Sequence, residues 1–266
     1  RGLNSMADGQ HYCAIVNGSL VMYSYKTGKV RDTLVKSRDL VPAGSEQGIT
    51  LDSYSFSRDE RMILIPTETE PIYRRSERSL YYIWNLDNEK LIRLSENGKQ
   101  RLADFSPDGT KVAFVRENNL FLKDILSGEE KQLTFDGKDR HIINGTTDWV
   151  YEEEFAITKG FYWSPDSKTI AFYKFDESGV PEYEMQMWGD LYPEMHRYKY
   201  PKAGEANSII SIHFYDLESG KTTKAELGDE TDQYIPRIKW SKKEGMLAIQ
   251  RLNRHQNHLE ILLLDR

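Results

Sequence analysis

The stretch FSPDGTKVAFV, Phe105–Val115, contains the pattern that recurs along the chain. It reads as an aromatic residue, a serine, a tight turn carrying Pro, Asp and Gly, and then an apolar strand. The same order is found in FSRDERMILI (Phe56–Ile65) and WSPDSKTIAFY (Trp163–Tyr173), with a weaker copy in WSKKEGMLAIQ (Trp240–Gln250). Each copy predicts two strands joined by a short turn, so we expect a chain made largely of β-hairpins.

A second type of hairpin follows these copies. The stretches SLVMYSYKTGKV, LYYIWNLDNEKL, LFLKDILSGEEKQLT and IHFYDLESGKTT all read as strand, polar turn and strand. The two hairpins together make a four-stranded unit with a spacing of about fifty residues, which is typical of a β-propeller blade. We therefore predict an all-β fold, an incomplete β-propeller of about five four-stranded blades. An all-β sandwich whose hairpins are similar by chance is the alternative.

Composition limits the partners and the compartment. The chain has 266 residues and a formal net charge of −6, which argues against a nucleic-acid partner because such proteins usually present a basic face. Cys13 is the single cysteine, so no intramolecular disulfide can form, and no apolar run is long enough to span a bilayer. Because an animal ectodomain would often carry paired cysteines, we expect an exported bacterial protein, periplasmic or at the cell surface.

Two segments interrupt the repeat. The first, around Lys138–Gly160, contains an acidic run. The second, Glu182–Asn207, reads EYEMQMWGDLYPEMHRYKYPKAGEAN and is too polar and too interrupted by proline for a core strand pair. We expect it to form a projecting hairpin arm, whose exposed Met, Trp and Tyr side chains would suit a protein–protein contact. A long solvated loop is the alternative.

The acidic run DWVYEEEF, Asp148–Phe155, is the candidate site. Thr147 or Asp148 can cap a short helix here, and acids in the first turn of a helix are mildly favourable. A solvated acidic helix start therefore explains the run without any ligand. A divalent cation would also suit carboxylate oxygens, but calcium prefers six or more oxygen ligands and no D-x-D-x-D-G loop accompanies the run.

Helix geometry limits what the three glutamates can bind together. Successive helix residues lie about 100° apart, so Glu152, Glu153 and Glu154 cannot all face one ligand, whereas two neighbours can. An ammonium has three donors, and two carboxylates can accept two of them. Trp149 and Tyr151 could wall such a site and strengthen charge pairing by lowering the local dielectric constant. A site for a primary amine is thus chemically reasonable.

The run also resembles a known family signature. DWVYEEEF is similar to the Asp-Trp-x-Tyr-Glu-Glu-Glu motif of the dipeptidyl peptidase IV family, which are prolyl oligopeptidase-type serine exopeptidases. WSPDSKTIAFYKFDESGVPEYE, YPKAGEAN and RLNRHQNHLEILLLD resemble segments that follow in that family. The resemblance implies that residues 1–266 are part of an N-terminal, about eight-bladed propeller. Since both ends look cut, we expect that the C-terminal blades and an α/β-hydrolase domain are absent.

The resemblance also implies roles for particular residues. Glu153 and Glu154 would bind the free α-ammonium of a peptide substrate, and Glu152 would point elsewhere. Arg74, in YRRSERSLYYIWNL, would bind a substrate carbonyl, although the neighbouring Arg75 is one residue away in register. The arm at Glu182–Asn207 would take part in homodimer formation.

The chain departs from the family in one respect that decides its chemistry. It has no G-x-S-x-G motif, which the serine nucleophile of an α/β-hydrolase domain requires. His255 and His258 form an H-x-x-H, which we interpret as chance because no helix is predicted there. We expect no catalytic residue, cofactor or metal site in this chain, and a parent enzyme that releases Xaa-Pro or Xaa-Ala dipeptides. A catalytically silent propeller that binds proteins and a tripeptidyl relative with a shifted amine anchor are the alternatives.

Overall fold

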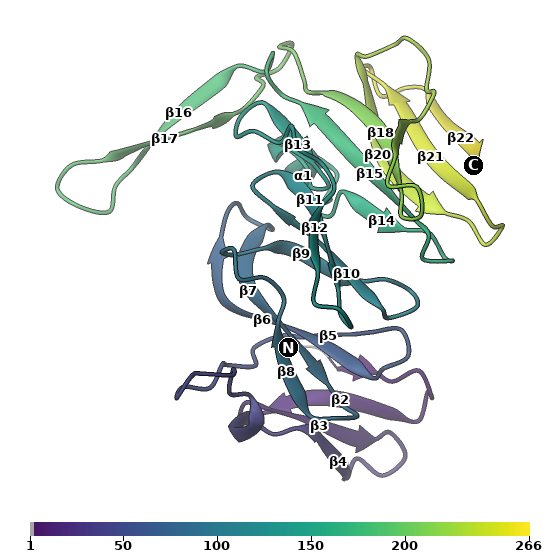
Figure 1. The fold of residues 1–266 in the computed structure, drawn as a ribbon. Coiled ribbons are helices and arrows are strands. Elements are labelled where there is room, and N and C mark those ends of the chain that lie inside the picture. The colour runs from purple at the N-terminus through teal and green to yellow at the C-terminus, as the bar shows by residue number, and fades with distance from the viewer. Residues whose placement is uncertain (1–2) are drawn as a thin grey trace. The chain divides into compact units, whose positions relative to one another are not determined.

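The computed structural model describes residues 3–266, in which antiparallel strands dominate and one short α-helix occurs (Figure 1). Strand pairs such as β2–β3, β6–β7, β15–β18 and β20–β21 are antiparallel, as hairpin connections require. The prediction of an all-β chain made of hairpins is therefore confirmed.

The first two sheets each have four strands in sequential order. The first contains β1 (Asn4–Ser5), β2 (His11–Val16), β3 (Ser19–Ser24) and β4 (Val30–Val35), and a 3-10 helix, η1 (Ser37–Asp39), follows it. The second contains β5 (Ser55–Phe56), β6 (Met62–Pro71), β7 (Glu77–Asn85) and β8 (Lys90–Arg93). Buried side chains of both sheets, among them Leu20, Ile63 and Trp84, share one apolar cluster.

The third sheet has the order β12-β11-β10-β9. Its strands are β9 (Arg101–Phe105), β10 (Lys111–Arg116), β11 (Asn119–Asp124) and β12 (Glu130–Gln132). Phe114 on β10 and Phe121 on β11 stack with their ring centroids 5.5 Å apart. The strands FSPDGTKVAFV and LFLKDILSGEEKQLT thus form the two hairpins of one sheet, as the repeat predicts.

The fourth sheet has five strands because an insertion splits one of them. Its elements are β13 (Ile142–Asn144), β14 (Phe161–Trp163), β15 (Thr169–Asp176), β18 (Ile209–Asp216) and β19 (Thr222–Lys224). β13 pairs with Lys174–Asp176 and β14 pairs with Ile170–Phe172, so the two short strands occupy successive parts of one edge of β15. Residues 145–160, which lie between them, contain helix α1 (Trp149–Glu154).

A separate hairpin leaves the fourth sheet between β15 and β18. It consists of β16 (Glu182–Met187) and β17 (Glu194–Lys199), which pair only with each other and project from the sheet (Figure 1). The last sheet has three strands, β20 (Gln233–Trp240), β21 (Met246–Asn253) and β22 (Leu259–Asp265). The described residues thus form three four-stranded sheets, one five-stranded sheet, one three-stranded sheet and the two-stranded hairpin, rather than five equal units.

The serine and aspartate of the repeated turn have the same role in three hairpins. In each, the serine hydroxyl donates to the aspartate two residues later: Ser57 to Asp59 at 2.6 Å, Ser106 to Asp108 at 2.6 Å and Ser164 to Asp166 at 2.5 Å. The same hydroxyl accepts a hydrogen bond from the backbone N–H five residues on, for example that of Lys111 at 3.0 Å. This side-chain bridge closes the turn, which explains why the motif recurs.

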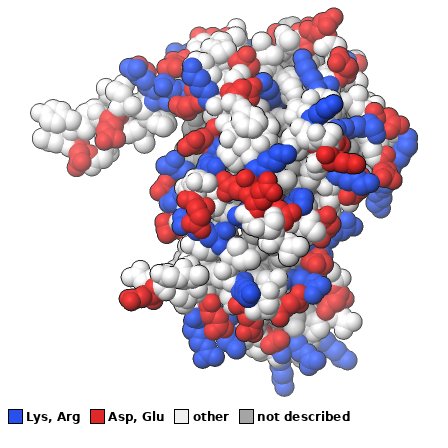
Figure 2. Space-filling view, viewed as in Figure 1, with Lys and Arg blue, Asp and Glu red and all other residues white. Residues whose placement is uncertain are grey.

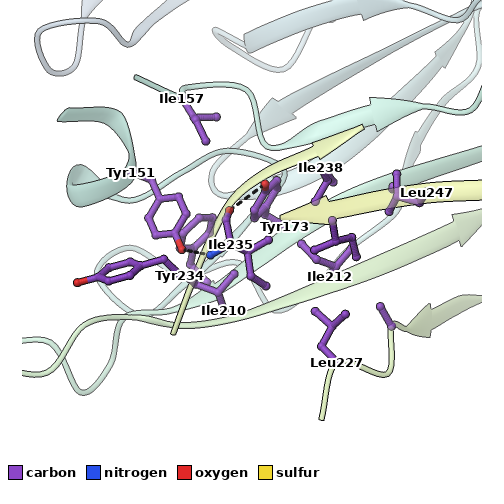
Figure 3. Close-up of a cluster of buried hydrophobic side chains, with 14 of the residues drawn as sticks. Tyr151, Ile157, Tyr173, Ile210, Ile212, Leu227, Tyr234, Ile235, Ile238 and Leu247 are labelled. Carbon is purple, nitrogen blue, oxygen red and sulfur yellow. Dashed lines mark hydrogen bonds between the residues drawn. The ribbon is translucent and has the colours of Figure 1, made fainter. Parts of the chain in front are cut away.

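The chain divides into two compact units. One comprises the chain up to Pro71, Glu77–Ala113 and Lys123–Glu130; the other comprises Ile72–Ser76, Phe114–Leu122 and Lys131–Arg266. The core of the second unit is a cluster of buried aliphatic and aromatic side chains from α1, β15, β18, β20 and β21 (Figure 3). All candidate site residues belong to this second unit, including the short turn that carries Arg74.

Candidate functional site

Helix α1 begins at a buried N-cap. Asp148 has extended backbone angles, and its carboxylate accepts a hydrogen bond from the Tyr151 N–H at 2.9 Å. The second carboxylate oxygen accepts a bond from the Ser208 hydroxyl at 2.6 Å, which ties the helix start to the segment before β18. The expected capping is confirmed, with Asp148 as the cap. A buried carboxylate with two donors holds the helix more firmly than a solvated cap would.

Tyr151 connects the helix to the core. Its side chain is 1% exposed, and its hydroxyl accepts a hydrogen bond from the Ile235 N–H of β20 at 2.7 Å (Figure 3). Its ring packs against Phe155 and Phe175 with centroids 4.9 and 5.0 Å away. Tyr151 therefore lies within the core and not on a solvent-facing wall of the site, which differs from the expectation.

Glu152 is buried and points to a distant part of the sequence. Its side chain is 1% exposed, and one carboxylate oxygen accepts the backbone N–H of Arg75 at 2.7 Å and of Ser76 at 3.0 Å. These amides belong to the turn Ile72–Ser76, which joins β6 to β7. The carboxylate of Glu152 thus points toward these backbone amides and not toward solvent.

Glu153 and Arg74 lie together in the structure. The guanidinium of Arg74 is 3.4 Å from a carboxylate oxygen of Glu153, and the side chains are 74% and 13% exposed respectively. Glu154, the next residue on α1, is exposed. Helix α1 therefore carries the two carboxylates, and the turn before β7 carries the guanidinium. The guanidinium that contacts Glu153 belongs to Arg74. Arg75 instead contributes a backbone N–H to Glu152.

An aromatic cluster, which we define as Tyr73, Trp149, Tyr183, Tyr198 and Tyr200, joins the two segments that carry Arg74 and Glu153 to the β16–β17 hairpin. Trp149 lies 4.5 Å from Tyr200 and 6.4 Å from Tyr198 between ring centroids, and it is only partly exposed. Tyr73, the residue before Arg74, lies 6.1 Å from Tyr198. The base of the β16–β17 hairpin therefore contacts both segments that carry the candidate site.

Of these five aromatic residues, sequence reasoning assigned only Trp149 to the site. Tyr198 and Tyr200 alternate with lysine in YKYP, which is compatible with a strand that presents one face to the site. Tyr73 had no such signal, because its partner lies more than a hundred residues along the chain. Ser208, the partner of the buried cap, was missed for the same reason.

Burial dominates the electrostatics at the start of α1. It raises the pKa of the Asp148 carboxyl above its usual range, although the hydrogen bonds from Ser208 and Tyr151 act in the opposite direction. Burial, with a smaller contribution from the charge of Asp148, also raises the pKa of Glu177 to about 7. Glu177 directly follows β15, at the base of the β16–β17 hairpin.

No group of three or more His, Cys, Asp or Glu side chains within residues 3–266 is arranged to hold a metal ion. Within the same range, no helix reaches the length and apolarity that a membrane-spanning helix needs. Acidic and basic side chains are interspersed over the face shown in Figure 2.

The sequence of this chain matches those of known proteins. The family model for the dipeptidyl peptidase IV N-terminal region matches residues 57–266. A dipeptidyl-aminopeptidase B of Phaeosphaeria nodorum is 32% identical over 79% of this chain and 25% of its own length, and one of Aspergillus terreus is 30% identical over 90% of this chain and 28% of its own length. The chain thus spans about a quarter of the length of these curated relatives.

Solved structures agree with this comparison. The crystal structure of Porphyromonas gingivalis dipeptidyl peptidase 4 is 41% identical and superposes with a TM-score of 0.92, covering 100% of this chain and 38% of that one. A dipeptidyl aminopeptidase IV from Bacteroides ovatus, at 23% identity and a TM-score of 0.70, shares the fold. Since the family model covers most of the sequence, the chain belongs to the family of the dipeptidyl peptidase IV N-terminal region.

Proposed function

We propose that this chain anchors the N-terminus of a peptide substrate in a serine exopeptidase that releases N-terminal dipeptides, Xaa-Pro or Xaa-Ala. Glu153 and Glu154 accept hydrogen bonds from the substrate ammonium, and Arg74 binds a substrate carbonyl. The serine nucleophile lies outside this chain, which has no G-x-S-x-G motif. The observation that carries the proposal is the ion pair between Arg74, in the turn before β7, and Glu153, on the helix that bears the family's acidic motif.

The weakness of the Arg74–Glu153 pair supports this role. Arg74 is 74% exposed, and an exposed ion pair contributes only about 0–1 kcal/mol to stability. A substrate ammonium with three donors can therefore take the carboxylate of Glu153 and that of Glu154 at little cost. Arg74, released from Glu153, is then free to turn its guanidinium toward the carbonyl of the same peptide.

The anchor sets the distance between the N-terminus of the substrate and the bond that is cleaved. It fixes the ammonium of the first substrate residue, and a nucleophile at a set distance then reaches the bond after the second residue. A blocked N-terminus has no positive charge, so it leaves the two carboxylates without a partner. Such a loss costs most at Glu153, whose side chain is only 13% exposed.

The test compares two substrates in the full-length protein. We expect a Gly-Pro chromogenic substrate with a free amine to be cleaved at least about 100-fold faster, in kcat/KM, than its N-acetylated form, because the latter loses about 3 kcal/mol of charge-assisted contacts. A control substrate, Gly-Gly-Pro, has a free amine but one additional N-terminal residue. It tests whether cleavage depends on the distance from the amine to the cleaved bond, and it should be cleaved poorly.

The other outcomes of this experiment separate the alternatives. Equal cleavage of the free and acetylated substrates would remove the amine role of Glu153 and Glu154. Preferred cleavage of Gly-Gly-Pro would indicate a tripeptidyl enzyme. A folded protein that cleaves none of the substrates but binds peptides would be a catalytically silent binding propeller.

We also propose that the β16–β17 hairpin is the contact of a homodimer. Its tip carries Trp188, Leu191 and Tyr192, which are 68%, 84% and 80% exposed. The outer part of the hairpin shows few charges in Figure 2, so it can be buried against a second copy with little desolvation cost. Exposed apolar side chains gathered at the tip of a hairpin are typical of a protein contact and are costly to leave in water.

Substitution of the tip tests the dimer. We expect Trp188→Glu combined with Leu191→Glu to convert the full-length dimer to a monomer, with the mass measured by light scattering. Leu126→Glu is the control, because Leu126 is 98% exposed but lies in another sheet region. A wild-type protein that is already monomeric, or a double variant that stays dimeric, would contradict the proposal.

A further inference from the structure

Two backbone amides that do not take part in the β6–β7 ladder converge on one buried carboxylate. The ladder ends where Pro71 pairs with Glu77, and the turn Ile72–Ser76 lies beyond it. One carboxylate oxygen of Glu152 accepts the N–H of Arg75 at 2.7 Å and the N–H of Ser76 at 3.0 Å. Burial of a carboxylate is costly unless hydrogen-bond donors replace its water. Glu152 is 1% exposed, so these two bonds compensate for its burial and are part of the folded structure.

The contact lies next to Arg74 in the chain, so it restrains the backbone of a candidate site residue. The N–H of Arg75 belongs to the peptide group that directly follows Arg74, so Glu152 fixes the backbone of Arg74. The side chain of Arg74 stays 74% exposed and can move, while its Cα is held beside α1. On the other side of Arg74, the ring of Tyr73 packs against Tyr198 at 6.1 Å.

We propose that Glu152 is a positioning residue, which holds the turn Ile72–Ser76 so that Arg74 is presented next to Glu153. The inference rests on the proposed function and deepens it. The three glutamates of the run then have separate tasks: Glu152 binds backbone amides, and its neighbours bind the ligand. A buried glutamate without this role would stabilise α1 but would have no effect that depends on Arg74.

Amide hydrogen exchange tests the contact without any activity. In the full-length protein, we expect Glu152→Ala to accelerate exchange of the Arg75 and Ser76 amides about tenfold or more, because each loses a bond to a charged acceptor. Glu152→Gln should keep most of the protection, since a side-chain amide oxygen has two lone pairs and can accept both bonds. Glu154→Ala, two residues on in the same helix, is the matched control and should leave these amides protected.

A double-mutant cycle in the full-length enzyme tests the consequence. We expect Glu152→Ala to lower kcat/KM for the free-amine substrate about 10- to 100-fold in the wild-type background, but less than about threefold in the Arg74→Ala background. If Glu152 acts through Arg74, its substitution should have little further effect on kcat/KM once Arg74 has been removed. Glu152→Gln should restore most of the wild-type rate.

The outcomes distinguish this inference from the proposed function. Unchanged exchange at Arg75 and Ser76 in Glu152→Ala, or equal losses in both backgrounds of the cycle, would overturn the positioning role. If the wild-type enzyme cleaves free and acetylated substrates equally, the amine role of Glu153 fails. The exchange result then still decides whether Glu152 holds the turn.

Discussion

Glu153→Gln in the full-length protein is expected to lower kcat/KM for a free-amine dipeptidyl substrate about 100-fold, and Glu154→Gln about tenfold. Glutamine keeps the size of the side chain and one acceptor oxygen, but it removes the charge that pairs with the ammonium. The loss is larger at Glu153 because its side chain is 13% exposed, whereas Glu154 is exposed and better screened by water. Loss of one partner of a buried charge pair costs about 3–5 kcal/mol, and partial exposure reduces this to about 2–3.

The ratio of free to acetylated substrate is the measurement that separates this effect from misfolding. A damaged fold lowers both rates together, whereas loss of the anchor lowers only the rate on the free amine and brings the ratio toward one. Glu226→Gln is the matched control, because Glu226 is an exposed glutamate between β19 and β20 and lies outside the site. Two glutamine variants that keep the wild-type ratio would contradict the anchor.

Local chemistry explains how much of the fold the sequence could predict. The Ser-x-Asp turn closes through contacts within five residues, such as those from Ser106 to Asp108 and Lys111, so its repetition is readable without any structure. The N-cap at Asp148 is equally local. Strand counts per sheet were less predictable, because the insertion that carries α1 splits one strand position into β13 and β14.

The site was predictable in part for the same reason. Helix geometry alone shows that the three glutamates must diverge, and the structure turns Glu152 inward, away from Glu153. The target of Glu152 could not be predicted, because it lies 77 residues away at Arg75. No local pattern indicates which turn will meet a buried carboxylate.

The same geometry explains why Tyr151 was wrongly assigned to the wall. Trp149 and Tyr151 are two residues apart, so they lie about 200° apart around the helix and cannot line the same face. Trp149 lies in the aromatic cluster beside the hairpin, and Tyr151 lies in the core. The opposite placement of the two rings orients α1, since Tyr151 fixes one side to β20 and Trp149 packs the other side against Tyr198 and Tyr200.

Tyr151→Ala is therefore expected to destabilise the second unit by about 3–5 kcal/mol, which is the usual cost of removing a large buried aromatic side chain. Its ring is 1% exposed, and the N–H of Ile235 would lose its acceptor. Tyr151→Phe keeps the ring and loses only that bond, so we expect about 1–2 kcal/mol. Thermal unfolding should show a drop of about 10 °C for alanine and a few degrees for phenylalanine.

The comparison with an exposed ring decides whether burial is the cause. Phe135→Ala removes an aromatic side chain that is 76% exposed, and we expect a change within about 0.5 kcal/mol. If Tyr151→Ala costs no more than Phe135→Ala, Tyr151 does not hold α1 to β20. In that case the orientation of α1 would have to come from its other contacts, which include the hydrogen bonds of Asp148 and Glu152 and the packing of Trp149 against Tyr200.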